Sequence, residues 1–251
     1  MHNKTHLGLN ADTLPPTCLI AGDPQRVMKM RSFWDSPRTV ADCRGYLCVA
    51  GSYRGVEIAA CCTGIGGPSC EIAIVELTQH GVSNIIRVGT CGGIDPAVNP
   101  GDLAILSGAI RYSGAADAYA PVNYPAVSDW EYVAALVDAC KARGFRWHVG
   151  IGLTVDSFYA TKPWLIASEP PNTEYSDMVT RWAGTGVLGM EMEAATLMVI
   201  GSVLRLRTAT ICTVGSNLPK GLRPDPAPSD DNAILAACDA AVAMQTIADG
   251  E

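Results

Sequence analysis

Two arginines stand beside glycine-rich turns, a combination suited to binding a small oxyanion. Arg26 follows Gly22 by four residues, and Arg87 precedes Gly89 by two. The backbone N–H groups of such turns can bind an anion, and a guanidinium adds paired, charge-assisted hydrogen bonds. A lone arginine is more often a surface charge. Arg87, however, interrupts the apolar run 85–88, where its charge would be costly without an anionic or carboxylate partner.

Two carboxylates, Glu191 and Glu193, lie in the apolar segment 189–195 ahead of a helical pattern. Residues two apart point in different directions on a helix, so a glycosidase-type carboxylate pair is disfavoured. One buried glutamate that accepts hydrogen bonds from substrate hydroxyls is the functional interpretation. The structural alternative is a carboxylate that caps the start of the helix.

Composition excludes several classes of protein. The chain has 251 residues, of which 48% are hydrophobic, and its 18 basic and 25 acidic side chains give a net charge of −7. This composition fits a folded protein and disfavours disorder or nucleic-acid binding. The apolar runs are far shorter than the ~20 residues of a membrane span, and no secretory signal is visible. We therefore expect a cytoplasmic protein with no nucleic-acid or membrane partner.

Metal and dinucleotide sites are not expected. The ten cysteines lie mostly in apolar runs and are best read as reduced core residues, and the four histidines fall at no zinc-ligand spacing. Glycine-rich turns occur at 21–26, 63–69, 87–93 and 150–152, but neither GxGxxG nor GxxxxGK[ST] is present.

Short apolar runs alternate with amphipathic stretches, which predicts an α/β fold: a single domain over residues 1–251 with a mixed or mainly parallel central sheet flanked by helices. The Pro-rich segments 160–171 and 219–228 are predicted to be loops near a site. Strands are expected at Thr17–Ala21, Tyr46–Ser52, Val56–Cys62, Asn84–Val88, Asp102–Ile110, Val149–Val155 and Thr208–Val214, and helices at Pro24–Phe33, Pro68–His80, Asp129–Arg143, Tyr175–Trp182, Met192–Leu204 and Ser229–Ala248.

Six segments occur in a characteristic order along the chain: His6-Leu7-Gly8-Leu9, 22–26, 63–69, 87–93, Asp156-Ser157-Phe158-Tyr159 and 191–195. Together they resemble the uridine phosphorylase branch of the hexameric nucleoside phosphorylases, and the resemblance covers roughly the whole chain. It implies the fold of that family and phosphorolysis, in which phosphate converts a nucleoside to free base and (deoxy)ribose 1-phosphate. It implies no cofactor besides phosphate as co-substrate, and a dimer-based homohexamer with sites shared between subunits.

The resemblance also assigns roles to individual residues. Arg26, Arg87 and Glu193 are the implied catalytic residues. Arg44 is implied to come from the neighbouring subunit, and His6 to reach the neighbour's ribose. The implied phosphate-binding set is Gly22, Arg26, Arg44, Arg87 and Thr90, and the implied ribose-binding set is His6, Thr90, Met192 and Glu193.

The base-reading positions depart from the family pattern. Lys162-Pro163-Trp164 stands where the uridine enzymes have a Gln-x-Arg pair, and Ser216 where the purine branch has an aspartate. The expected base-binding residues are Phe158, Lys162, Trp164 and Ser216, although Trp164 could simply pack and Lys162 could be a solvated loop charge. We expect uridine to be a poor substrate, with weak, broad activity or a preference for a base whose substituent stacks on Trp164.

Three alternatives remain at this stage. A purine nucleoside phosphorylase shares the fold, as does a nucleosidase, but a hydrolase that binds water has no need of three arginines. A non-catalytic nucleoside-binding protein is permitted by the altered base loop, because function belongs to the site rather than to the fold. Gly45 stands where the uridine enzymes have a glutamate for an intersubunit potassium ion, so the resemblance does not decide whether this chain binds that ion.

Overall fold

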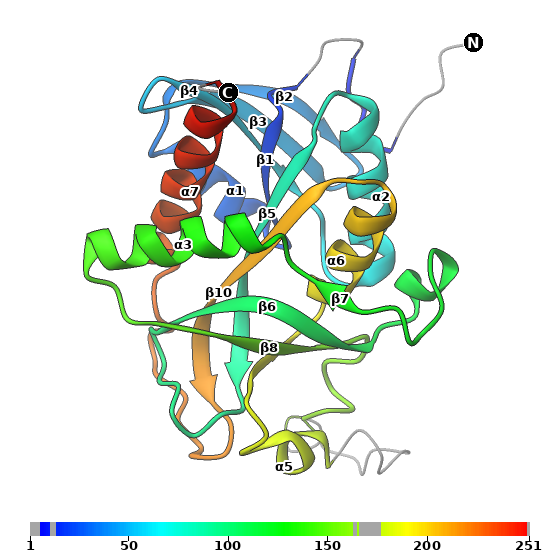
Figure 1. Cartoon of the computed structure of the whole chain (residues 1–251), viewed down its shortest axis with the longest axis vertical. Coiled ribbons are helices and arrows are strands. Elements are labelled where there is room, and N and C mark those ends of the chain that lie inside the picture. The colour runs from blue at the N-terminus through cyan, green and yellow to red at the C-terminus, as the bar shows by residue number, and fades with distance from the viewer. Residues whose placement is uncertain (1–5, 11–13, 163–164, 166–176, 250–251) are drawn as a thin grey trace.

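The computed structural model describes residues 6–10, 14–162, 165 and 177–249 (Figure 1). In this part of the chain, ten strands form one mixed sheet with helices packed against it. The strands are β1 Thr17–Ala21, β2 Asp35–Cys43, β3 Tyr46–Tyr53, β4 Val56–Cys62, β5 Asn84–Gly93, β6 Leu103–Tyr112, β7 Ala126–Val127, β8 Trp147–Val155, β9 Val187–Glu191 and β10 Arg207–Asn217. The helices are α1 Pro24–Arg31, α2 Gly67–Gln79, the 3-10 turn η1 Ala115–Ala118, α3 Trp130–Arg143, α5 Met178–Trp182, α6 Ala194–Val203 and α7 Asp231–Asp249.

Strand β5 is the hub of the sheet. It pairs in parallel with β1 and β10 and antiparallel with β9. Five strands pair in a closed ring, in the order β5, β10, β6, β8 and β9. The sheet continues from β5 through β1, β4 and β3 to β2, which is an open edge. Because β1, β5 and β10 are parallel, their carboxyl ends lie at one edge of the sheet, which is where ligands bind in open α/β folds.

Side chains alternate across the sheet and give it two apolar faces. Leu19 and Ala21 of β1 pack with α1, α3 and α7, whereas Cys18 and Ile20 pack with α2 and α6. This is the two-residue period of a strand buried on both sides. The helices accordingly cover opposite faces, with α3 and α7 on one side of Figure 1 and α2 and α6 on the other.

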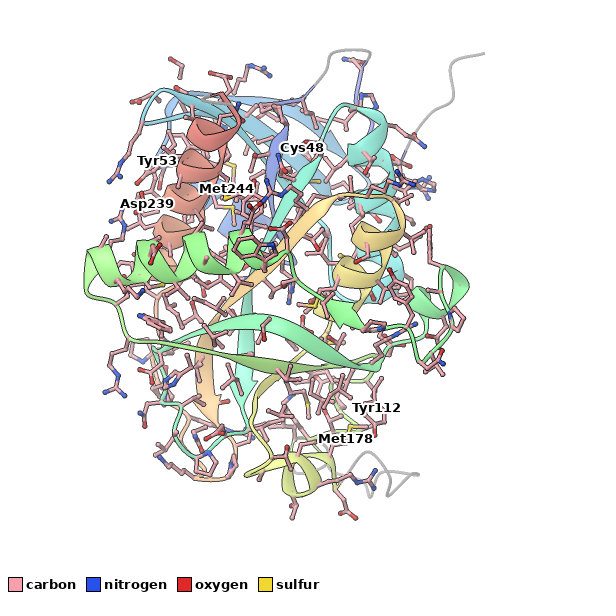
Figure 2. The ribbon with its side chains drawn as sticks, viewed as in Figure 1. Cys48, Tyr53, Tyr112, Met178, Asp239 and Met244 are labelled. Carbon is pink, nitrogen blue, oxygen red and sulfur yellow. The ribbon has the colours of Figure 1, made fainter. Side chains whose placement is uncertain are left out.

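Helix α7 is anchored by one carboxylate. Asp239 accepts a hydrogen bond from the Tyr53 hydroxyl of β3 at 3.1 Å and pairs with Arg143 Nε of α3 at 2.5 Å (Figure 2). Ala237 and Met244 of the same helix belong to the buried apolar cluster that also includes residues of α1 and α3. These contacts fix the helix, and with it the position of its first turn.

The helix starts follow their sequence signals. Asp23 caps α1, accepting from the Gln25 N–H at 2.8 Å ahead of Pro24. Asp129 caps α3 in the same way, and Gly144 ends that helix in the left-handed conformation at φ 69°. Such caps satisfy N–H groups that have no partner within the helix.

The predicted α/β architecture with a mixed sheet is confirmed, and all seven predicted strands and six predicted helices have counterparts. The prediction missed β2, β7, β9 and η1, and it ended β5 five residues early. Residues 175 and 176 of the expected helix 175–182 lie outside the described residues, and α5 begins at Met178. None of the described helices is long and apolar enough to cross a membrane. A single domain over 1–251 stays a prediction.

Candidate active site

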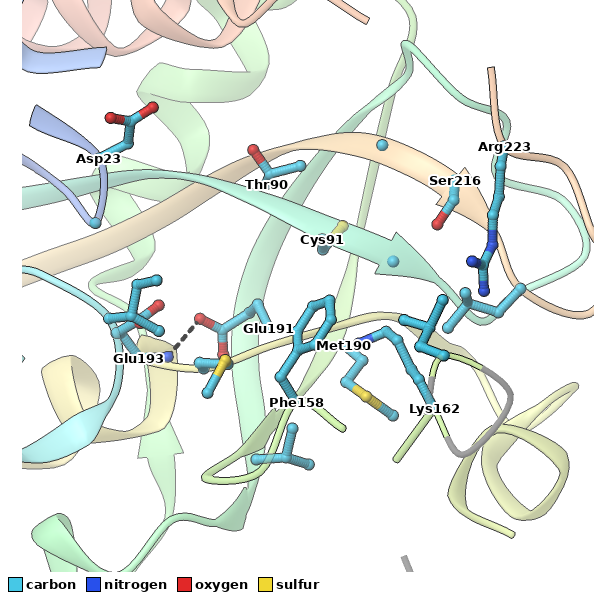
Figure 3. Close-up of a pocket in the computed structure, with 18 of the residues that line it drawn as sticks. Asp23, Thr90, Cys91, Phe158, Lys162, Met190, Glu191, Glu193, Ser216 and Arg223 are labelled. Atoms are coloured by element: carbon cyan, nitrogen blue, oxygen red, sulfur yellow. Dashed lines mark hydrogen bonds between the residues drawn. The ribbon is translucent and has the colours of Figure 1, made fainter. Parts of the chain in front are cut away.

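A pocket of about 500 Å³ opens at the carboxyl ends of the parallel strands. The turn after β1 and the ends of β5, β9 and β10 form its walls, together with the segment after β8 (Figure 3). Most of the residues predicted from the sequence meet here: Gly22, Arg26, Arg87, Thr90, Phe158, Lys162, Met192, Glu193 and Ser216 all line the pocket.

Arg87 is the buried centre of the site, with only 3% of its surface exposed. Its Nε lies 3.0 Å from Glu191 Oε2, and its Nη2 lies 2.6 Å from Glu193 Oε2. Burial by itself would lower the pKa of Arg87, but the two carboxylates outweigh burial and raise it. A side chain at Gly89 would meet the guanidinium, since a Cβ there would lie 2.9 Å from Nη2. Gly89 therefore makes room for the Arg87 guanidinium.

Glu193 directly precedes α6 and lines the pocket. The Gly66 N–H donates to its Oε1 at 2.5 Å. Gly66 has φ 93°, a conformation that favours glycine, and it holds this N–H toward the carboxylate. Burial raises the pKa of Glu193, while the charge of Arg87 opposes that shift. One Glu193 oxygen is thus paired with a cation and the other with a backbone donor.

The capping role considered for Glu193 belongs to Glu191 instead. Glu191 Oε2 accepts from the N–H groups of Glu193 and Ala194 at 2.7 and 2.8 Å, and Oε1 accepts from Thr154 Oγ1 at 2.5 Å. Glu193 makes no side-chain cap bond. Both glutamates line the pocket, but the Glu191 carboxylate holds the start of α6 against β8 and β5, whereas Glu193 has no such capping role.

Arg26 and Thr90 form one corner of the pocket, and both side chains can donate hydrogen bonds to an anion. Arg26 lies in α1 and Thr90 near the end of β5, and Arg26 Nη2 donates to Thr90 Oγ1 at 2.7 Å. Gly22 allows the turns after β1 and β4 to approach, since a Cβ there would lie 3.1 Å from the Gly64 oxygen. The Arg26 guanidinium and the Thr90 hydroxyl line this corner, and Arg87 lines the same pocket; this set of donors suits a tetrahedral oxyanion.

The opposite end of the pocket carries Phe158, Lys162 and Ser216, and Arg223 lies beside them (Figure 3). Lys162 Nζ lies 3.8 Å from the centroid of the Phe158 ring. Lys162 is buried, so it is not the solvated loop charge considered as an alternative. Burial, assisted by the charge of Arg223, lowers the pKa of Lys162 to about 8. Trp164, the remaining predicted base contact, lies outside the described residues.

Sequence reasoning missed several residues of the pocket wall. Arg223 is the most consequential, because it adds a second cation to the Lys162 end. Its only sequence signal was its place in the Pro-rich segment 219–228. Met190 and Leu218 are also lining residues, and they read from the sequence as ordinary apolar positions.

His6 and Arg44 do not line the pocket of their own chain. Arg44 lies at the exposed tip of the β2–β3 hairpin with φ 53°. The N-terminal segment is held by Glu76, whose Oε1 lies 2.7 Å from His6 Nδ1 and whose Oε2 accepts from the Leu7 N–H at 2.9 Å. Donation of His6 and Arg44 to a neighbouring subunit stays a prediction.

No group of three or more His, Cys, Asp or Glu residues that could hold a metal ion occurs among the residues that the structure describes.

Comparison with known proteins places this fold and site in a family. The sequence model of the phosphorylase superfamily matches residues 16–248. The uridine phosphorylase of Thermococcus kodakarensis is 39% identical over 214 residues, which are 84% of this chain and 76% of that protein. The uridine phosphorylase of Escherichia coli is 36% identical over 219 residues, covering 83% and 84% of the two chains. The guanosine phosphorylase of Halorubrum lacusprofundi is 35% identical over 221 residues, covering 88% and 86%.

The chain belongs to the phosphorylase superfamily. The predicted resemblance to nucleoside phosphorylases close to the uridine phosphorylase branch is confirmed, as is the prediction that the chain is an enzyme of the pentosyltransferase class.

Proposed function

We propose that this protein cleaves nucleosides by phosphorolysis, with inorganic phosphate as the co-substrate and no other cofactor. The observation that carries the proposal is the convergence of Arg26, Arg87, Thr90 and Glu193 in one pocket. Arginines and a hydroxyl provide the donors that phosphate needs, and a carboxylate a short distance away provides acceptors for sugar hydroxyls.

In the proposed reaction a phosphate oxygen attacks the anomeric carbon of the sugar. The bond between that carbon and the base nitrogen breaks, and its electron pair leaves with the base, which takes up a proton. Positive charge develops on the sugar in the transition state, and the bound phosphate stabilises it while acting as nucleophile. Arg26 and Arg87 orient the phosphate. Glu193 accepts from the ribose hydroxyls, with Met192 packing against the sugar, and so fixes the ring for in-line attack.

The base is proposed to lie at the Lys162 end of the pocket, against the face of Phe158. Lys162 and Arg223 are donors only, so they match carbonyl oxygens rather than amino groups. Arg223, which the sequence analysis did not include, adds a donor at this end of the pocket, and for this reason we replace the expectation that uridine is a poor substrate. We therefore propose a substrate with an oxo base, and we expect uridine, inosine or guanosine to be cleaved in preference to adenosine. Ser216 can donate or accept at the same edge.

We further propose that the active form is a cytoplasmic homo-oligomer in which His6 and Arg44 complete a neighbour's site. Arg44 is exposed at a hairpin tip, and the His6 side chain is 46% exposed and held by Glu76. Both are free of their own chain's pocket, as residues that serve a neighbour must be.

The test is base release from a panel of nucleosides, read by chromatography with and without inorganic phosphate. The proposal predicts release only with phosphate, in step with the formation of a pentose 1-phosphate. Equal release without phosphate would identify a nucleosidase. Nucleoside binding with no release at high enzyme concentration would identify a binding protein.

A further inference from the structure

We propose that Asp230 is a positioning residue, which holds Arg26 and Thr90 in the orientation that receives phosphate. The inference rests on the proposed use of Arg26 and Thr90 as phosphate ligands. It adds to that site a carboxylate that does not itself touch the substrate.

One carboxylate joins both phosphate-binding side chains. Asp230 Oδ2 accepts from Arg26 Nε at 2.8 Å, and Asp230 Oδ1 lies 3.4 Å from Thr90 Oγ1. The three residues come from segments far apart in the sequence: α1, β5 and the residue before α7. Because Arg26 Nη2 also donates to Thr90 Oγ1, the three side chains form a closed triangle of hydrogen bonds.

Asp230 lies behind this corner of the pocket rather than inside it. Arg26 and Thr90 line the pocket, whereas Asp230 does not. The carboxylate engages Arg26 through Nε, while Nη2 donates to Thr90 Oγ1 and Nη1 donates to the Val88 carbonyl at 3.4 Å, so the guanidinium is fixed from three sides. The Thr90 hydroxyl can transfer its weak 3.4 Å hydrogen bond from Asp230 to an arriving phosphate. The geometry thus fits an orienting group and not an occupant of the anion site.

Asp230 has two opposing effects on phosphate binding. Whether phosphate affinity falls or rises when Asp230 is replaced shows which effect is larger. A carboxylate close to an anion site repels the anion, which would weaken phosphate binding. Holding a long arginine in one conformation removes the entropy cost of ordering it when phosphate arrives, which would strengthen binding. The Arg26 side chain is 12% exposed and that of Asp230 is 22% exposed, so the pair is only partly screened by solvent. We expect the orienting effect to dominate.

The chain offers a matched control at the next residue. Asp231 also lies at the start of α7, but its carboxylate pairs with Lys29 Nζ at 2.8 Å on the surface, and its side chain is 42% exposed. Substituting Asp231 removes the same charge at the same helix start without touching Arg26 or Thr90.

The experiment compares Asp230→Ala, Asp230→Asn and Asp231→Ala with the parent protein. Michaelis constants for phosphate and for the nucleoside, kcat, and calorimetric titration with inorganic phosphate are measured for each. For Asp230→Ala we expect the KM and Kd for phosphate to rise about tenfold or more, the usual effect of losing a hydrogen bond between charged groups. The KM for the nucleoside should stay within about twofold. Asp230→Asn keeps an acceptor for Arg26 Nε, so it should recover part of the loss, and Asp231→Ala should match the parent.

The positioning role is contradicted if Asp230→Ala binds phosphate as well as the parent or more tightly, because repulsion would then be the larger effect. It is also contradicted if Asp231→Ala loses as much affinity, since the charge at the helix start would then be responsible. Calorimetry separates these outcomes from failure of the proposed function. A parent protein that binds phosphate but releases no base contradicts phosphorolysis and leaves the comparison between Asp230 variants intact.

Discussion

The Nη2 atom of Arg87 lies 2.6 Å from Glu193 Oε2, and the two side chains are only 4% and 5% exposed. This contact joins the middle of β5 to the residue directly before α6. It ties the cation proposed for phosphate to the carboxylate proposed for the sugar before either substrate is present. Groups fixed in this way need little reorganisation during the reaction, which is the basis of electrostatic stabilisation of a transition state.

The two arginines should differ in what their removal costs. Arg87→Ala leaves Glu191 and Glu193 buried without their cation, so we expect a loss of about 3–5 kcal/mol in the free energy of unfolding, together with loss of activity. Arg26→Ala should cost less, about 1.5–3 kcal/mol in the free energy of unfolding, because it removes one partly buried charged hydrogen bond and leaves Asp230 22% exposed. It should still lose about 2.7–4 kcal/mol of transition-state stabilisation. Urea unfolding and kcat/KM measure the two effects, and near-normal turnover of Arg26→Ala at saturating phosphate would contradict its role.

Substitutions of Glu191 and Glu193 should also have different effects, one mainly on stability and the other mainly on turnover. Glu193→Gln keeps the shape but removes the charge that strengthens hydrogen bonds to sugar hydroxyls, so turnover should fall steeply while the fold persists. Glu191→Gln weakens the cap of α6 and the pairing with Arg87, and it should lower the melting temperature. Thermal melts and steady-state kinetics on both variants test this division. A fully active Glu193→Gln protein would show that this carboxylate is structural.

Lys162 should give the nucleoside kinetics an alkaline limb. Burial and Arg223 bring its pKa from the usual 10.5 to about 8. Above that pH the side chain loses its charge, so kcat/KM for the nucleoside should fall as pH rises through about 8. Lys162→Arg keeps a cation at all these pH values and should remove the limb. An unchanged limb in Lys162→Arg would assign it to another group.

The lowered pKa of Lys162 also affects stability, which should rise with pH where activity falls. The pKa of Lys162 is lower in the folded protein than in the unfolded chain, so folding disfavours the charged form. The penalty is complete below about pH 8 and disappears as pH rises toward 10.5. The free energy of unfolding of the parent, relative to Lys162→Met, should therefore increase across this window. A difference that does not vary with pH would contradict the lowered pKa.

If each active site uses residues of two subunits, two inactive variants should restore activity when they assemble into one oligomer. Arg44→Ala damages the site of a neighbour, whereas Glu193→Gln damages the site of its own chain. In a mixed oligomer, a pocket with an intact Glu193 can receive an intact Arg44 from the other variant. Co-expression of the two variants should thus restore activity that neither has alone. Light scattering should show an oligomer at assay concentration, and a fully active monomer would contradict the arrangement.

Strands with continuous apolar sequence could be predicted closely, whereas an exposed strand and a short strand interrupted by glycine could not. The bounds of β1 and β4 match because both strands are nearly unbroken apolar runs. The strand β2 was missed because it is mostly exposed and contains Pro37. The strand β9 was missed because Gly189 and the following glutamates read as the approach to a helix. Tertiary pairing, rather than local pattern, decides such segments.

A site residue could be predicted where its neighbours in the sequence indicated its role. The charge of Arg87 inside an apolar run required an anionic partner, and the structure supplies two carboxylates. The division of roles between Glu191 and Glu193 depends on which side chain reaches the helix N–H groups, and spacing does not determine this. Asp230 and Arg26 are hydrogen-bonded although they lie 204 positions apart in the sequence, so no local sequence pattern predicts the pair.

The identity of the nucleophile is the central claim, and isotope labelling tests it most directly. A nucleoside that the enzyme cleaves is incubated with inorganic phosphate in H₂¹⁸O, and the sugar product is analysed by mass spectrometry and ³¹P NMR. Phosphorolysis predicts a pentose 1-phosphate with no ¹⁸O on the anomeric carbon, because the oxygen attached there comes from phosphate. A free pentose that carries ¹⁸O at this carbon would show that water is the nucleophile and would contradict the proposed reaction.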